Sequence, residues 1–165
     1  RIIMSALQVA GYLIATQTGL AYAQTLDPTQ NTQGAVLGNF MTLLGTTLIF
    51  LTNMHHLAIG AIAGSYRMLP PGGHLPTGDM AQLVIQLTSS SFALGFQLAA
   101  PFLGVGGAVE AGLGGLARLM PQLQIFFVAV PLNIMCGFLI MLALLGSLMT
   151  VFLTYYANSM AIFLR

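Results

Sequence analysis

Hydrophobic residues along this chain gather into four long stretches, which three polar or Pro/Gly-rich segments separate. Each stretch is close to or longer than the roughly 20 residues that a helix needs to cross a bilayer. We therefore expect an all-α fold, an integral membrane helical bundle of about four long helices in one domain, residues 1–165. The expected helices cover about residues 2–22, 36–69, 79–120 and 123–165.

The segments between the stretches contain residues that end helices. Asp27 and Pro28 lie in the longest polar segment, and proline keeps the residue before it out of the helical region. A Pro-Pro-Gly-Gly run at residues 70–73 follows the second stretch. Pro121 separates the third stretch from the fourth, so these two should form a tight antiparallel hairpin at the C-terminal end.

The third and fourth expected helices are unusually long, and each contains a proline. At 1.5 Å per residue each would measure about 60 Å, about twice the hydrocarbon thickness of a bilayer. Pro101 and Pro131 lie inside them, and internal prolines kink helices. We therefore expect Pro-kinked helices, part of whose length is buried against protein outside the bilayer.

The composition indicates a membrane protein. Hydrophobic residues make up 57% of the chain, charged residues make up 4%, and lysine is absent. Water-soluble domains carry about 25% charged residues, so lipid or a large partner surface must cover this chain. A net charge of +1 gives no basic stripe, which argues against binding to nucleic acid. The chain begins with Arg1 rather than methionine, so we expect a fragment that lacks the N-terminal part of a longer protein.

Small residues recur four apart at several places, and this spacing lets helices approach closely in a membrane. The series are Gly11, Ala15 and Gly19; Gly34 and Gly38; Gly60 and Gly64; and Gly107, Ala111 and Gly115. We expect close helix packing at these positions, within the chain or with other subunits.

Ionisable residues within apolar helices are candidates for function, because a charge in a membrane is costly. Glu110 is the only acid deep in such a stretch. It is either a structural carboxyl that a neighbouring helix satisfies, or a proton relay, which would need a second acid or a histidine nearby. Asp79 and Arg118 are expected at the two ends of the third helix, where the helix dipole favours their charges.

His55 and His56 lie side by side in the middle of the second expected helix. Adjacent positions point about 100° apart, so the pair does not present two ligands to one metal as histidines four apart do. Buried hydrogen bonding is the favoured interpretation, and metal or proton handling is the alternative. The Thr-Ser-Ser-Ser run at residues 88–91 is expected to donate hydrogen bonds to preceding carbonyls of its own helix.

Motifs typical of enzymes do not occur in the sequence. There is no P-loop, no Gly-x-Gly-x-x-Gly and no metal-spaced cluster, and the single Cys136 forms no redox pair. We therefore expect no enzymatic activity, no cofactor and no metal.

Three motifs occur in a recognisable order along nearly the whole chain. Gln17, Gly19 and Leu20 lead through the Asp-Pro pair at residues 27–28 to a Val-Leu-Gly run at residues 36–38. The two histidines precede a Ser-Tyr-Arg-Met-Leu-Pro-Pro-Gly run at residues 65–72. Arg118 is followed by a Pro-Gln pair at residues 121–122, by Phe126 and by a Pro-Leu pair at residues 131–132. This order resembles the FliR/SctT family of type III secretion export-gate proteins.

The resemblance implies a core subunit of the bacterial type III, or flagellar, protein export gate, in the inner membrane within the flagellar basal body or the injectisome base. The implied partners are homologues of FliP, FliQ and FlhB, around a channel for unfolded export substrates. The resemblance also maps a pore plug onto about residues 18–33. Its residues would be Tyr22, Thr25, Leu26, Asp27, Pro28, Gln30 and Asn31.

The polar plug segment has independent support, because such a break at membrane depth is tolerated only against protein or a water-filled cavity. A connector at the membrane surface is the alternative. Outside the plug, a second set is expected to be buried polar or packing groups: His55, His56, Glu110, Arg118, Pro121, Gln122 and Pro131. The alternative function is an ion-coupled secondary transporter or pump, with Glu110 and the Pro-broken helices forming a midplane site.

Overall fold

Helices make up all the regular secondary structure in the described part of the chain. The structure is a computed structural model that describes residues 1–20, 35–68, 77–119 and 125–163. No β-strand occurs in these ranges, so the all-α prediction is confirmed for them. The helices are α1 (Ile2–Gln17), α3 (Ala35–Leu51), α4 (His55–Met68), α5 (Thr77–Leu119) and α6 (Ile125–Ala161).

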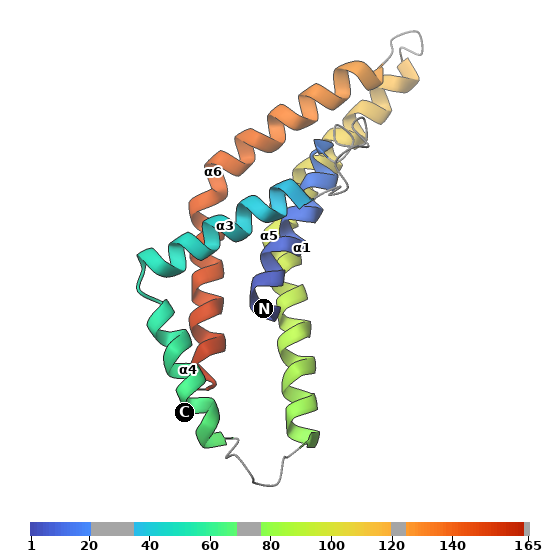
Figure 1. Ribbon diagram of the computed structural model, residues 1–165. Helices are drawn as coiled ribbons and strands as arrows, with labels where there is room; N and C mark the ends of the chain where they lie inside the picture. The colour runs from blue at the N-terminus through green and yellow to red at the C-terminus, as the bar shows by residue number, and fades with distance from the viewer. Residues whose placement is uncertain (21–34, 69–76, 120–124, 164–165) are drawn as a thin grey trace, which may run out of the picture.

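The two long helices α5 and α6 form the arms of the molecule and run antiparallel, as the predicted hairpin requires (Figure 1). The arms come together at one end and lie apart at the other (Figure 1). Helix α1 lies along α5, α3 crosses α1 on its way to α6, and α4 runs beside α6 (Figure 1). Helix α1 is therefore held between α5 and α3, and it is the centre of the bundle.

Helix α1 ends earlier than the sequence suggested, at Gln17 instead of Tyr22. Gly19 has a φ of 75°, the left-handed conformation that commonly ends helices at glycine. The Gly19 N–H donates to the Thr16 carbonyl at 3.3 Å, and the Thr18 hydroxyl donates to the Ile14 carbonyl at 2.9 Å. These bonds close the last turn, so the chain leaves the helix axis at this point.

The expected second helix, residues 36–69, is in fact two helices. Asn53 has a φ of 58°, and its N–H donates to the Phe50 carbonyl at 3.2 Å. The Met54 N–H donates to the Ile49 carbonyl at 3.0 Å. This pair of bonds around a left-handed residue is a Schellman motif, which ends α3, and α4 starts immediately afterwards. The two helices are bent by 85°.

Two helices of the described chain are long and apolar enough to cross a membrane, Thr77–Gly115 and Ala129–Ala161. A third crossing is possible if the bent pair of α3 and α4 counts as one span. Helix α1 has 16 residues and is shorter than a span. The membrane helical bundle is thus confirmed, whereas the first expected helix is shorter than predicted and the second is broken in two.

The long helices change direction near their middles (Figure 1). Pro101 is residue 25 of the 43 in α5, so the bend of α5 falls near its proline. Pro131 is the seventh of the 37 residues of α6, well before the middle of that helix. The Gly146-Ser147 pair lies closer to the middle of α6, and such pairs are a second known cause of kinks.

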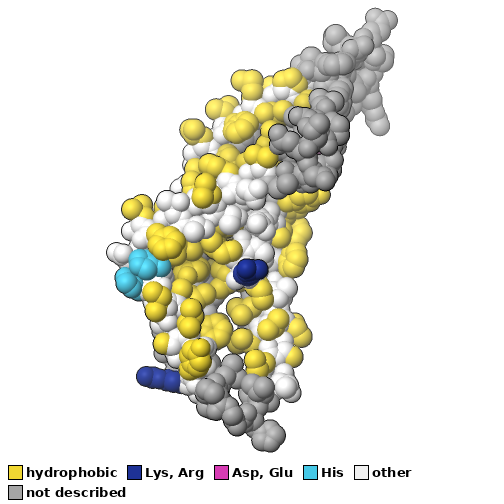
Figure 2. Space-filling model, in the orientation of Figure 1, with side chains coloured by type: hydrophobic (Ala, Val, Ile, Leu, Met, Phe, Trp, Pro, Cys, Tyr) yellow, Lys and Arg dark blue, Asp and Glu magenta, His cyan; other side chains and the backbone are white. Residues whose placement is uncertain are grey.

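The buried core surrounds α1, whose inward positions repeat every three or four residues as expected for one helix face. These positions are Ile3, Ala6, Leu7, Ala10, Gly11, Ile14 and Ala15. Phe102 of α5 and Phe152 of α6 are 2% and 0% exposed and belong to the same core. Many large apolar side chains outside it are exposed, among them Phe40, Phe96 and Leu142. The chain therefore covers only part of its own apolar surface (Figure 2).

Glycines allow the central helices to touch. A Cβ atom built on Gly11 would lie 2.5 Å from the backbone nitrogen of Gly38, and one built on Gly38 would lie 3.2 Å from the Gln8 carbonyl oxygen. The backbones of α1 and α3 are thus in direct contact at Gly11 and Gly38. The predicted close packing is confirmed here, whereas Gly107 and Gly115 of α5 have no neighbour within 4 Å in the described chain.

Candidate functional site

The predicted plug residues Tyr22, Thr25, Leu26, Asp27, Pro28, Gln30 and Asn31 lie outside the described residues. The structure describes the point from which this segment starts, the C-terminal end of α1. The geometry of that end is therefore the part of the candidate site that can be examined.

Two side chains at the end of α1 fit against glycines on the two long helices. A Cβ atom built on Gly106 of α5 would lie 2.5 Å from Cγ and from Nε2 of Gln17. A Cβ atom built on Gly137 of α6 would lie 2.7 Å from Cβ of Thr18. Only glycine leaves room for these side chains, so Gln17 contacts one arm of the hairpin and the next residue contacts the other.

Only a small cavity lies beside this end of α1. The cavity that Gln17 and Thr18 share with Phe102, Asn133 and Cys136 has a volume of about 10 Å³, roughly the room that one water molecule needs. Thr18 is also fixed by its hydroxyl bond to the Ile14 carbonyl. The C-terminal end of α1 is therefore in close contact with both α5 and α6.

The histidines lie at the start of α4 and not in the middle of a helix. The rings of His55 and His56 have centroids 4.2 Å apart, and the His55 ring stacks on Phe50 with centroids 5.3 Å apart. His56 is exposed, and the buried Nδ1 of His55 has no hydrogen-bond partner within the described chain. Figure 2 shows the histidine side chains at the outer margin of the molecule. Within the described chain the pair thus makes no buried hydrogen bond, and the expectation stays a prediction.

The other expected packing residues divide into three cases. Glu110 and Pro131 are exposed on α5 and α6, so neither is buried by another helix of the described chain. Arg118 belongs to the last turn of α5, as predicted, but its side chain is outside the described part. Pro121 and Gln122 also lie outside the described residues.

The hydroxyl run on α5 behaves only partly as predicted. Thr88 donates to the Val84 carbonyl at 2.8 Å, and Ser90 donates to the Gln86 carbonyl. Ser91 instead meets the Tyr155 hydroxyl of α6 at 3.1 Å. This contact between the two arms depends on the fold and has no local signal in the sequence.

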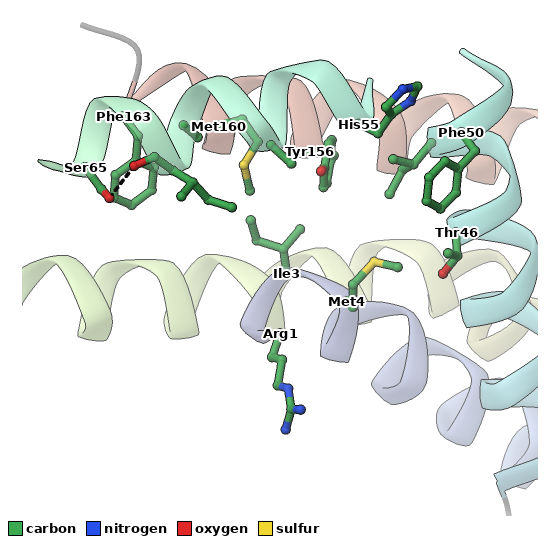
Figure 3. Close-up of a pocket in the computed structure, with 14 residues that line it drawn as sticks. Arg1, Ile3, Met4, Thr46, Phe50, His55, Ser65, Tyr156, Met160 and Phe163 are labelled. Atoms are coloured by element: carbon green, nitrogen blue, oxygen red, sulfur yellow. Dashed lines mark hydrogen bonds between the residues drawn. The ribbon is translucent and has the colours of Figure 1, made fainter. Parts of the chain in front are cut away.

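An open, largely apolar cleft of about 530 Å³ lies between α1, the α3–α4 bend and the end of α6. Ile3 and Met4 of α1 face Tyr156 and Met160 of α6 across it (Figure 3). Arg1 points away from the centre of the cleft in the same view (Figure 3). Among the described residues, no three His, Cys, Asp or Glu side chains gather into a potential metal site there or elsewhere.

The sequence did not indicate Gly106 and Gly137 as site residues. A glycine inside an apolar helix shows that something approaches the helix closely, but it does not show what. The residues that fill the two positions lie 89 and 119 places earlier in the chain, at Gln17 and Thr18. Only the folded arrangement brings them together.

Comparison with known proteins places the chain in a family. Residues 1–159 match the model of the family described as bacterial export proteins, family 1. The flagellar biosynthetic protein FliR of Caulobacter vibrioides is 36% identical over 163 residues, which are 99% of this chain and 65% of that protein. FliR of Escherichia coli is 30% identical over 141 residues, 86% of this chain and 54% of that protein.

A protein with a different name is also similar to this chain. The Yop proteins translocation protein T of Yersinia pestis is 27% identical over 130 residues, 78% of this chain and half of that protein. The chain thus spans less than two-thirds of the length of these three relatives. The family model, in contrast, covers nearly all of the chain, including α1, both arms and the bend between α3 and α4. This chain therefore belongs to the bacterial export proteins, family 1.

Proposed function

We infer that the chain is part of a core subunit of a bacterial type III, or flagellar, protein export gate. Its relatives carry the names flagellar biosynthetic protein FliR and Yop proteins translocation protein T, which supports this function. In this proposal the subunit joins homologues of FliP, FliQ and FlhB in the inner membrane, within a basal body or injectisome base. Together they line a channel for unfolded export substrates, and the subunit itself performs no covalent chemistry.

The exposed apolar surface supports an assembly with other subunits. Phe40, Phe96 and Leu142 lie on three different helices and are 44%, 53% and 83% exposed. Surfaces of this kind on a protein are normally covered by lipid or by a partner. Helices α5 and α6 are also longer than a bilayer is thick, at about 65 and 55 Å, so part of each helix needs cover other than hydrocarbon.

The segment after α1 acts in this proposal as a plug that closes the channel before secretion. The observation that carries this role is the position of Gln17 and Thr18, which are held against Gly106 of α5 and Gly137 of α6. A polar segment that starts between two apolar arms needs water or protein beside it and not lipid.

Deletion of residues 25–33, bridged by a short flexible linker in the full-length protein, tests the plug. We expect cells with the assembled gate to leak ions or small solutes, as measured with a permeability assay. Gly137→Ala should also raise the leak, because the added methyl group displaces Thr18, which is β-branched and cannot rotate aside. Gly112→Ala is the matched control, since a Cβ atom there has no neighbour within 4 Å.

Unchanged permeability after the deletion, with the complex shown to assemble normally, would contradict the plug but not the gate. The gate itself is tested by deleting the whole gene. Export of flagellar or type III substrates should stop, and the substrates should remain in the cytoplasm. Continued export would contradict the gate function.

The transporter alternative finds no support in the described structure. A proton relay through Glu110 would need a second acid or a histidine beside it, but Asp79 lies 31 residues away on α5, a rise of about 46 Å. Glu110 is also exposed on the chain. If the Glu110→Gln substitution abolished ion-driven solute uptake in vesicles and left oligomerisation unchanged, the result would support the transporter alternative.

A further inference from the structure

One face of the C-terminal half of α5 is exposed in the described chain. It consists of Leu103, Gly107, Glu110 and Gly114. Their spacings of four, three and four residues place them within about 60° of one another around the helix axis, at 100° per residue. The same spacing forms the seam of a coiled coil, where one helix packs along another.

The two glycines of this face allow a close approach that nothing within the chain uses. Cβ atoms built on Gly107 and Gly114 would have no neighbour within 4 Å, whereas the adjacent Gly106 is filled by Gln17. Glycine disfavours a helix relative to alanine, and small residues at this spacing let a second helix come near in a membrane. These glycines alone are compatible with any partner, so the choice of partner depends on Glu110.

Glu110 determines the chemistry of the partner. It lies within the candidate span Thr77–Gly115, and its neighbours on the face are an apolar residue and glycines. A carboxylate in such surroundings is strongly unfavourable against lipid, and acids in membrane helices almost always face the interior of an assembly or a water-filled cavity, where they pair with another polar group. The described cations of this chain do not supply the pair, because Arg1 precedes α1 and Arg67 is in the last turn of α4.

We propose that the α5 face of Leu103, Gly107, Glu110 and Gly114 is a contact site for a helix of a different subunit, which supplies an arginine or lysine to Glu110. The glycines admit the backbone of the partner helix, and the carboxylate fixes its register through one charged pair. A second copy of this chain fits less well, since its described cations lie at helix ends. The inference rests on the proposed function only in requiring an assembly with other subunits.

The test uses the full-length protein in its purified assembly, with a photoreactive benzophenone amino acid at position 110. We expect irradiation to give a covalent product with a different subunit, and peptide mapping should locate it in a helix that contains an arginine or lysine. A product with lipid, with a second copy of this chain or with nothing, in an intact assembly, would overturn the proposal.

Charge reversal provides the second measurement. Glu110→Lys should lower the recovery of the assembly about tenfold or more, because it places two cations together in the contact. Reversal of the mapped arginine or lysine to glutamate should restore recovery. Asp79→Lys, in the first turn of α5 and away from the face, is the control and should leave recovery within about twofold, as for a solvated charge. Failure of the restoring pair would contradict the proposed ion pair.

Replacing a glycine by a larger residue tests whether a partner helix approaches this face closely. Gly107→Leu should reduce recovery, while Gly112→Leu should not, because residue 112 points to the opposite side of α5 and is equally open in the chain. Equal effects of the two substitutions would contradict a contact specific to this face. If the unchanged protein forms no hetero-oligomer and supports no export, the proposed function fails. If the gate is intact but residue 110 contacts no other subunit, only the proposed contact fails.

Discussion

The hydroxyl groups of Ser91 on α5 and Tyr155 on α6 lie 3.1 Å apart and join the two long arms of the molecule. Ser91 is 2% exposed, so neither water nor lipid can replace its partner. Most other described hydroxyls, such as those of Thr46 and Thr150, bond to a carbonyl four residues earlier in their own helix. The Ser91–Tyr155 bond therefore contributes to the relative position of the arms and not to the stability of one helix.

Removing either hydroxyl should weaken the contact between the arms. We expect Ser91→Ala and Tyr155→Phe each to lower the free energy of unfolding by about 0.5–1.5 kcal/mol. A double-mutant cycle should give a coupling of about 0.6 kcal/mol, the average for such bonds in a membrane protein. The measurement is SDS-induced unfolding of the purified protein, with the exposed Ser89→Ala as control. Additive effects would show that the bond does not form.

Alanine at Gly11 should lower the stability of the protein, whereas alanine at an open helical glycine should raise it. The new methyl group would lie against the backbone of Gly38, which cannot rotate away, so α1 and α3 must separate. We expect a loss of about 1–3 kcal/mol in stability. Gly112→Ala, where nothing lies within 4 Å, should instead gain roughly 0.5–1 kcal/mol. Similar unfolding curves for the two variants would contradict the direct contact of the helices.

The left-handed conformation of Asn53 predicts an order of tolerated residues. Glycine adopts a φ of 58° without strain, so Asn53→Gly should leave the stability within about 0.5 kcal/mol. Asn53→Val should cost about 1–2 kcal/mol, because a β-branched residue is poorly accommodated there. Thermal unfolding of the two variants measures the difference. A valine variant as stable as the glycine variant would mean that the helix does not bend at this residue.

Two phenylalanines of α6 allow a comparison of buried and exposed positions. Phe152 is 0% exposed and contributes to the core around α1, so Phe152→Ala should cost about 3–5 kcal/mol. Phe138 is 54% exposed in the chain, so its replacement should leave the fold of the isolated subunit within about 0.5 kcal/mol. If Phe138→Ala instead reduces recovery of the assembly, the same position faces a partner.

The long helices could be predicted from the sequence because their apolar stretches exceed any other element in length. Helix α5 begins at Thr77 and ends at Leu119, close to the expected residues 79 and 120. The break at Asn53 was not predicted, since the hydrophobic pattern continues on both sides of it and asparagine signals a helix end only weakly. Gly19 carried a stronger signal for the end of α1, as a glycine that follows an apolar helix.

The candidate site could be predicted only in part, because its contacts join residues far apart in the chain. The polar segment after α1 was evident from composition, whereas the contact of Thr18 with Gly137 depends on how α1 packs between the arms. The exposure of Glu110 and His56 was not predicted either. In one chain of an assembly, the groups that a partner would bury are exposed. The sequence does not show whether a residue will be buried by its own chain or by a partner.

The bend between α3 and α4 changes the length that this part of the chain presents to a membrane. As one straight helix, the 34 residues from Ala35 to Met68 would extend about 51 Å and exceed the bilayer core by about 21 Å. With an 85° bend, the distance between the far ends falls to about 34 Å. A sequence segment that is too apolar and too long for a single crossing thereby avoids hydrophobic mismatch, and the lipid around it need not thicken.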